Sequence, residues 1–159
     1  MAFDPLVSGD SPRATSINNP VCARLPAEMR ENASRLFVWG TYVVAAAVVV
    51  QFLLAGLGVF ADSGFLFWHA SVNSVVVGLL PLVLVLVGWL GRVPGRLLWL
   101  MAAMFGLTVL QSLLLFPYHL DARGALRYIS GLHVVNALFM AWVVLQLVDR
   151  TRAWAARPA

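Results

Sequence analysis

Two histidines in a very apolar chain are each followed, within about one helical turn, by an asparagine. His69 precedes Asn73 in the segment HASVN, and His133 precedes Asn136 in the segment HVVN. Neutral imidazole is a common metal ligand and a common axial ligand of haem iron. Two imidazoles that face one another across a helical bundle can therefore hold a planar metallocycle, with the carboxamides one turn away as hydrogen-bonding partners.

Each histidine also follows a glutamine from the preceding apolar segment. Gln51 opens the motif QFLL and precedes His69, and Gln111 opens the motif QSLL and precedes His133 at a similar spacing. Amide and imidazole side chains are costly in lipid and normally face the interior of a bundle. The repeated order predicts two related hairpins and a polar region toward one end of the bundle.

The composition indicates that these residues lie in a membrane. The chain has 159 residues, of which 61% are hydrophobic and 11% charged, with a mean hydropathy of +0.85. A soluble domain carries roughly 25% charged residues. Residues 36–61, 63–91, 97–120 and 128–148 contain no charged side chain. Each run can cross the ~30 Å of hydrocarbon, and because backbone amides in lipid must be paired, the runs are expected to be helices.

We therefore predict an all-α, up-down-up-down four-helix transmembrane domain over residues 36–148, with a two-hairpin pseudo-repeat. Short connections make consecutive helices antiparallel neighbours. The expected helices cover residues 36–60, 65–90, 97–117 and 129–148, and the loop at 117–131 is expected to hold a short interfacial helix. Residues 1–35, rich in Pro, Ser and Asn, are expected to form a flexible cytoplasmic tail, and residues 149–159 a second cytoplasmic tail.

The arginines predict the orientation of the bundle. Nine of the eleven lie on the side of the two termini, and only Arg123 and Arg127 lie on the other side. The positive-inside rule places the nine in the cytoplasm, so both termini are expected there. The use of arginine for every basic residue is typical of a GC-rich bacterium, which suggests a bacterial cytoplasmic (inner) membrane. The net charge of +4 reflects this topology, and no nucleic-acid partner is expected.

A haem b site is the first functional prediction. His69 and His133 lie on the second and fourth helices, which are diagonally opposed in a square bundle, so they are expected to be the axial ligands. Gln51 and Gln111 are expected to contact the cofactor or its ligands, and Arg127 can bind a haem propionate, because arginine pairs with carboxylates in a bidentate manner. A stripe of small residues on the face of Gln51 would make room for the ring: Gly40, Ala47, Ala55 and Gly58.

The predicted helix ends place the two histidines at different depths. His69 lies about 20 residues from the inner end of its helix and His133 about 15, a difference of roughly 7 Å. A kink at Pro81 can absorb part of this difference. His119, at the edge of the outer loop, is an alternative candidate for an axial ligand.

These motifs resemble one four-helix half of haem A synthase. The resemblance rests on QFLLAG (51–56), His69, QSLL (111–114) and LHVVNALFMAWVVL (132–145). It implies a half-bundle with one histidine in its second helix and one in its fourth that holds haem. The catalytic half of that family has a glutamate where this chain has Leu66, and its paired loop cysteines are absent, so a stand-alone enzyme is not expected. The chain also resembles uncharacterised small four-helix bacterial membrane proteins, known as a domain of unknown function.

Three functions remain open on the sequence. The first is haem b binding for electron transfer or haem carriage near the extracytoplasmic face. The second is a non-enzymatic small subunit or assembly factor of a membrane complex, in which the His, Asn and Gln side chains join helices. The third is a quinone-linked redox subunit that uses Gln51, His69 and Arg127. The bilayer is the expected environment, a redox partner or a larger complex is the expected partner, and a homodimer is compatible with so small a bundle.

Overall fold

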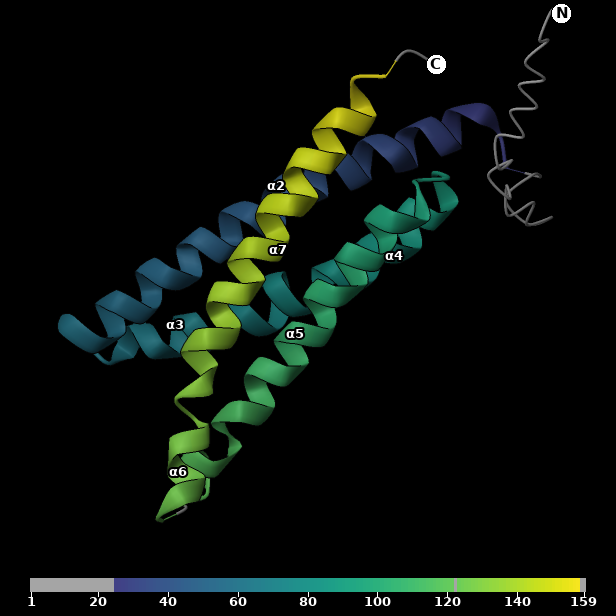
Figure 1. Ribbon diagram of the computed structural model, residues 1–159. Helices are drawn as coiled ribbons and strands as arrows, with labels where there is room; N and C mark the ends of the chain where they lie inside the picture. The colour runs from purple at the N-terminus through teal and green to yellow at the C-terminus, as the bar shows by residue number, and fades with distance from the viewer. Residues whose placement is uncertain (1–24, 122, 158–159) are drawn as a thin grey trace, which may run out of the picture.

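The computed structural model describes residues 25–121 and 123–157, and every regular element in these two ranges is helical (Figure 1). The prediction of an all-α four-helix membrane bundle is confirmed. The first span is α2 (Ala27–Phe60), the third is α5 (Gly95–His119), and the fourth is α7 (Leu132–Ala155). The second span has three parts: α3 (Gly64–Val72), the π-helix η1 (Asn73–Leu79) and α4 (Leu80–Leu90). The outer loop contains the short helix α6 (Ala125–Ile129), as expected.

The helices reach further at the arginine-rich end than predicted. α2 begins at Ala27, so residues 27–35 are helical rather than part of a tail. This segment is rich in good helix formers, and Glu31 and Arg35, one turn apart, form an ion pair at 2.6 Å. α7 continues past Asp149 to Ala155. The helices thus extend about two turns beyond the predicted boundaries at 36 and 148, and residues 1–24 of the predicted N-terminal tail lie outside the described residues.

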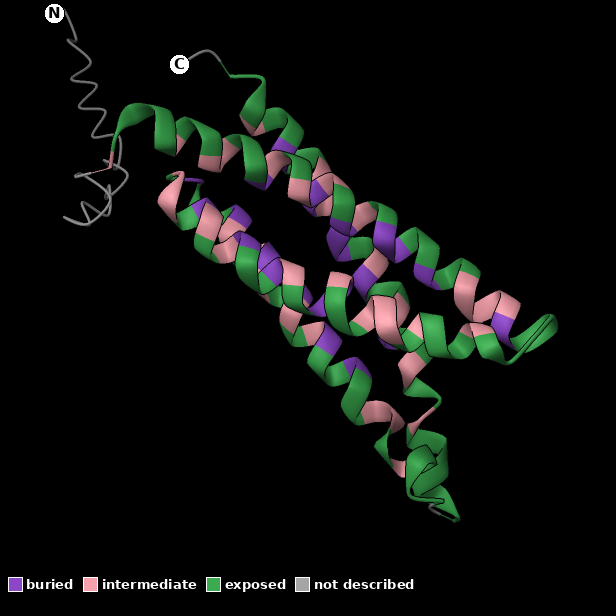
Figure 2. Cartoon of the chain, turned by 180° about the vertical axis from the view of Figure 1, so that it is seen from behind, coloured by how far each residue is buried: buried purple, intermediate pink, exposed green. Residues whose placement is uncertain are grey.

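Large apolar side chains cover the outside of all four long helices. Side chains such as Trp39, Leu53 and Leu145 are mostly exposed, and exposed residues dominate the outer surface in Figure 2. A soluble protein rarely leaves such extensive apolar surface uncovered. Together with four helices that are long and apolar enough to cross a bilayer, this surface identifies a multi-pass membrane protein.

The bundle is closed at one end and divided at the other. The core lies toward the arginine-rich end, where Phe37, Leu84, Met101 and Leu147 are almost fully buried between α2, α4, α5 and α7. At the other end, α3 packs on α2 and η1, and α6 packs on α5 and α7. The α2–α3 hairpin and the α5–α7 hairpin diverge there (Figure 1). No residue of α3 is buried, so the two hairpins leave space between them at this end.

A π-helix lies in the second span, immediately before Pro81. η1 covers seven residues, and the Leu80 N–H donates to the Val75 carbonyl five residues earlier. Pro81 has no N–H, so the Val77 carbonyl four residues before it loses its usual helical donor. The Thr108 hydroxyl of α5 lies 3.2 Å from that carbonyl and 2.9 Å from the Met104 carbonyl of its own helix, so its one proton is shared between the two acceptors. The predicted distortion at Pro81 is therefore a local change of helix type, with a hydrogen bond from a neighbouring helix in place of the missing one.

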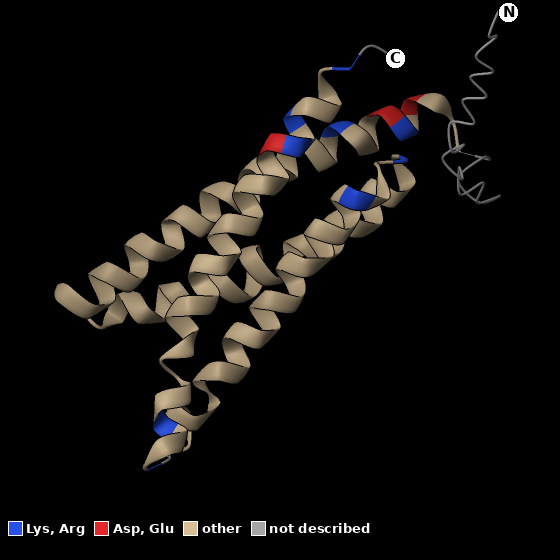
Figure 3. Ribbon diagram, viewed as in Figure 1, with Lys and Arg blue, Asp and Glu red and all other residues tan. Residues whose placement is uncertain are grey.

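The charged residues gather where α2 begins and α7 ends (Figure 3). The arginines of the described residues at this end are Arg30, Arg35, Arg92, Arg96, Arg150, Arg152 and Arg157, whereas Arg123 and Arg127 lie in the α5–α7 connection at the opposite end. Both ends of the four-helix domain thus share the basic side of the bundle. The distribution is the one on which the prediction of cytoplasmic termini rests.

Candidate functional site

His69 is held by a reciprocal pair of hydrogen bonds to Gln51 on the neighbouring helix α2. Its Nδ1 lies 3.1 Å from the backbone carbonyl oxygen of Gln51, and the Gln51 side-chain amide donates to the backbone carbonyl of His69 at 2.9 Å. A carbonyl oxygen only accepts, so Nδ1 must carry the proton. In the neutral imidazole, Nε2 then keeps its lone pair and is available as a ligand.

His133 makes the same backbone contact in the second hairpin. Its Nδ1 lies 3.2 Å from the backbone carbonyl oxygen of Gln111 on α5, so Nδ1 is again the donor. The Gln111 side-chain amide donates to His133 Nε2 at 3.0 Å. The Asn136 amide in turn donates to Gln111 Oε1 and to the backbone carbonyl of Leu107 at 2.9 Å. The repeated Gln–His contact gives the two predicted hairpins a common structural feature.

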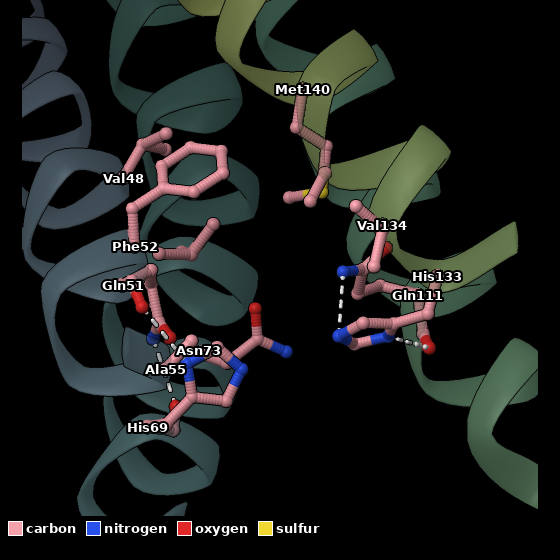
Figure 4. A pocket seen from close by; sticks show the side chains of 12 residues that line it. Val48, Gln51, Phe52, Ala55, His69, Asn73, Gln111, His133, Val134 and Met140 are labelled. Atoms are coloured by element: carbon pink, nitrogen blue, oxygen red, sulfur yellow. Dashed lines mark hydrogen bonds between the residues drawn. The ribbon is translucent and has the colours of Figure 1, made fainter. Parts of the chain in front are cut away.

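The two imidazole rings face one another across the interior of the bundle. Their centroids are 6.3 Å apart and their planes are inclined by 57°, and Figure 4 shows the Nε2 side of each ring directed toward the other. A metal–imidazole bond is about 2.0–2.1 Å long, so two imidazoles on opposite sides of one metal ion have centroids about 6 Å apart. The observed separation matches this value, and His133 would exchange its bond from Gln111 for the bond to the metal.

The predicted difference in depth between the two histidines is absent. The expectation of roughly 7 Å came from ending the fourth helix at position 148. In the structure α7 continues to Ala155, and α4 ends at Leu90. His133 and His69 are therefore almost equally far along the chain from the inner ends of their spans, and the two side chains start at nearly the same level of the bundle.

Two cavities lie on either side of the histidine pair, and both are lined by His69, Asn73, Gln111 and His133. The inner cavity has a volume of about 180 Å³ and largely apolar walls, formed by Val48, Phe52, Ala55, Val77, Val134, Ala137 and Met140 together with Gln51 (Figure 4). The outer cavity has a volume of about 240 Å³ and a more polar wall that includes Ser74, Ser112 and His119. A flat ring held at its centre by the two imidazoles needs space on both sides of the pair.

The remaining predicted residues divide between the site and its surroundings. Gln51 and Gln111 are both buried and both line the inner cavity. His119 is exposed at the end of α5 and reaches only the outer cavity. Arg127 lies on α6 and is not among the residues that line either cavity, so the structure does not bring this predicted propionate partner to the histidines.

Sequence reasoning missed the apolar walls of the inner cavity. Of the small-residue stripe, only Ala55 lines it, whereas Val48 and Phe52 of the same helix were not singled out. Met140 on α7 lines it as well and also belongs to the buried core. The spacing of these residues was a usable signal, because positions three, four and seven residues from a buried polar residue share its face of a helix. Val48 and Ala55 have that spacing from Gln51, and Met140 has it from His133.

Comparison with known proteins gives one partial match. A model of a family of unknown function (DUF6220) matches residues 51–117. The matched segment begins at Gln51 and contains His69, Asn73 and Gln111, whereas His133 lies beyond it. This similarity agrees with the expected resemblance to an uncharacterised membrane domain and shows no link to haem A synthase. No curated protein and no solved structure matches the chain.

Proposed function

We propose that this chain is an integral membrane protein that binds haem b between His69 and His133, for electron transfer or haem carriage. The observation that carries the proposal is the facing pair of Nε2 atoms on rings 6.3 Å apart. Each ring is oriented by an Nδ1 hydrogen bond to a backbone carbonyl, which is the usual support of a metal-binding histidine. Haem iron would supply a one-electron ferric–ferrous couple.

The surroundings of the pair fit a haem. The inner cavity offers apolar walls to the hydrocarbon edge of the ring, and the outer cavity offers a polar wall to its charged edge. Gln111 supports His133 through its backbone carbonyl and its amide. The resemblance to one half of haem A synthase agrees with a haem-holding bundle. Because Leu66 stands where that family has its glutamate, we propose no modification of haem.

The proposed location is the cytoplasmic membrane of a bacterium with both termini in the cytoplasm. The proposal rests on the arginines at the end where α2 begins and α7 ends. In this orientation the histidine pair lies in the extracytoplasmic half of the bundle. Reporter fusions to each terminus and to the α5–α7 connection would test it, and a periplasmic signal from either terminus would contradict it.

Absorbance of the pure protein tests the haem proposal. Protein from haem-supplemented cells should show a Soret band, which His69→Ala and His133→Ala should each abolish or strongly reduce. His119→Ala is the matched control, since His119 touches only the outer cavity, and it should retain the band. Added imidazole should restore the spectrum of His69→Gly by filling the space of the missing ring. A colourless wild type, or a band that survives both His69→Ala and His133→Ala, would overturn the proposal.

A second candidate function is that of a small subunit or assembly factor of a membrane complex. The observation in its favour is that each polar group joins helices within one hairpin: Gln51 with His69, and Gln111 with His133 and Asn136. Side-chain hydrogen bonds between membrane helices contribute about 0.6 kcal/mol each on average. On this hypothesis His69→Ala lowers stability, the wild type is colourless, and a defined partner copurifies with both histidine variants.

A further inference from the structure

The two histidines of the pair differ at Nε2, the atom that would bind a metal. His133 Nε2 accepts a hydrogen bond from the Gln111 side-chain amide at 3.0 Å (Figure 4). His69 donates from Nδ1 to a backbone carbonyl as His133 does, but its Nε2 makes no hydrogen bond with residues 25–121 or 123–157. One of the two lone pairs is therefore free of protein donors, and the other is engaged.

The Gln111 amide is held in this direction by its neighbour on α7. Asn136 donates to Gln111 Oε1, and this bond leaves the amide nitrogen of the same planar group directed at His133. Gln111 and Asn136 are only 5% and 7% exposed, so water has little access to compete with them. Gln51, the counterpart in the first hairpin, donates instead to the backbone carbonyl of His69. The hydrogen bond to Nε2 thus belongs to the second hairpin alone.

This difference makes the two imidazoles unequal as ligands. Nε2 of a neutral imidazole that is protonated at Nδ1 has one acceptor position, so His133 can bind a metal or accept from Gln111 but cannot do both. When His133 leaves a metal, it regains the hydrogen bond from Gln111. When His69 leaves a metal, no donor from the described residues awaits its Nε2. An acceptor that regains its donor is less costly to release than one left unpaired, so the bond to His133 is the weaker one.

The packing of the helices favours breakage at the same bond. No residue of α3, which carries His69, is buried, whereas α5 and α7 each have several buried side chains. Segments with few buried contacts open at low cost in free energy. An outward movement of α3 separates the two rings and leaves His133 beside Gln111 in the second hairpin.

We propose that His133 is the exchangeable ligand of the haem site, and that Gln111 is the positioning residue that engages its Nε2 after release. The inference rests on the proposed function, because it concerns the same site. His69 is then the permanent ligand, and the position that His133 leaves admits a small neutral ligand such as carbon monoxide. In this exchange the bond from His133 to iron breaks, the incoming ligand supplies the replacing electron pair, and Gln111 donates to the released Nε2. No proton or electron is transferred.

Carbon monoxide added to the reduced, haem-loaded protein tests the exchange. The wild type should form a carbonyl complex with a shifted Soret band. Gln111→Leu should bind carbon monoxide about threefold more weakly, the factor that corresponds to one hydrogen bond between membrane helices, because the released His133 no longer regains its donor. Gln146→Leu is the matched control, since it makes the same substitution at a glutamine that lines neither cavity, and it should bind like the wild type.

A reduced spectrum that carbon monoxide leaves unchanged would overturn this inference, as would equal affinity in the wild type and Gln111→Leu. Both results leave haem binding itself intact, whereas a colourless wild type overturns the proposed function and this inference with it. If Gln111→Leu does not fold, the two histidine variants decide. His133→Ala should retain more residual haem than His69→Ala, because His69→Ala leaves only the imidazole that is engaged by Gln111. The reverse order would contradict the proposal.

Nuclear magnetic resonance of haem-free protein gives a readout that needs no cofactor. The chain has three histidines, so selective ¹⁵N-histidine labelling gives few signals, which single His→Ala variants assign. At about pH 8.5, where imidazole is ordinarily neutral, the Nε2 signals of His69 and His133 should differ in the wild type, because only His133 accepts from Gln111. The His133 signal should move toward that of His69 in Gln111→Leu and stay in place in Gln146→Leu. Coincident Nε2 signals in the wild type would overturn the role of Gln111.

Discussion

Replacing Asn136 by leucine tests whether the second hairpin depends on its carboxamide. Asn136 is 7% exposed and its amide donates to two acceptors on α5, Gln111 Oε1 and the Leu107 carbonyl. Leucine is similar in size but has no donor. Gln111 is itself 5% exposed, so water cannot readily take the place of the lost amide. We expect a clear loss of stability.

The expected loss is about 2 kcal/mol, the net of three contributions. Two hydrogen bonds between membrane helices contribute about 0.6 kcal/mol each on average. The acceptor left unpaired on Gln111 adds roughly 1–3 kcal/mol, and part of this cost is recovered because leucine improves the apolar contacts of the site. The effect should be a decrease in the free energy of unfolding, measured by far-ultraviolet circular dichroism as SDS is added to protein in mixed micelles.

Asn73→Leu is the matched control, because Asn73 occupies the related position in the first hairpin and makes no hydrogen bond with the described residues. Its free energy of unfolding should change by less than about 0.5 kcal/mol. Both variants make the same substitution about one turn below a histidine, at a buried position for Asn136 and a half-buried one for Asn73. Equal destabilisation by the two variants would refute the conclusion that only the second hairpin depends on its asparagine. An Asn136→Leu variant as stable as the wild type would refute it as well.

Two further predictions concern the helices that position the site. Thr108→Val should lower the free energy of unfolding by about 1 kcal/mol. The loss should be smaller in a Pro81→Ala background, where alanine supplies an N–H to the Val77 carbonyl. Additive losses in a double-mutant cycle would contradict the link between Thr108 and Pro81. Gly91→Ala should lower the thermal midpoint, because the new Cβ would lie 2.7 Å from a backbone nitrogen of α2. Gly56→Ala places its Cβ where no other atom lies within 4 Å. This variant should leave the midpoint unchanged or raise it. The reverse order of the two glycine variants in a thermal melt would show that the packing is assigned wrongly.

The sequence predicted the four spans because lipid imposes a simple rule on composition. A charge-free run of about 20 residues that must pair its own amides can only be a helix in this setting. The same rule could not locate the helix ends. Hydropathy reports where the lipid ends, and α2 and α7 continue as helices into the basic region. Ending the fourth helix before Asp149 produced the false difference in depth between His69 and His133.

The residues of the site could be predicted from the sequence, but the contacts between them could not. The order of glutamine, histidine and asparagine indicated two related hairpins, and Gln51, His69, Gln111 and His133 do line one cavity. The groups that orient the imidazoles are backbone carbonyls, which every residue carries and no motif reveals. Arg127 was chosen for its charge, and it is not among the residues that line either cavity.

The unequal asparagines give the two hairpins different roles. In the second hairpin the carboxamide joins α5 to α7 and fixes Gln111 against His133. In the first, the Asn73 carboxamide makes no hydrogen bond with the described residues, and Gln51 Oε1 is buried without a donor from them. α3, which carries His69, has no buried residue, and segments with few buried contacts open at low cost in free energy. α3 is therefore the part of the site that opens most easily, whereas α5 and α7 are each held by several buried side chains.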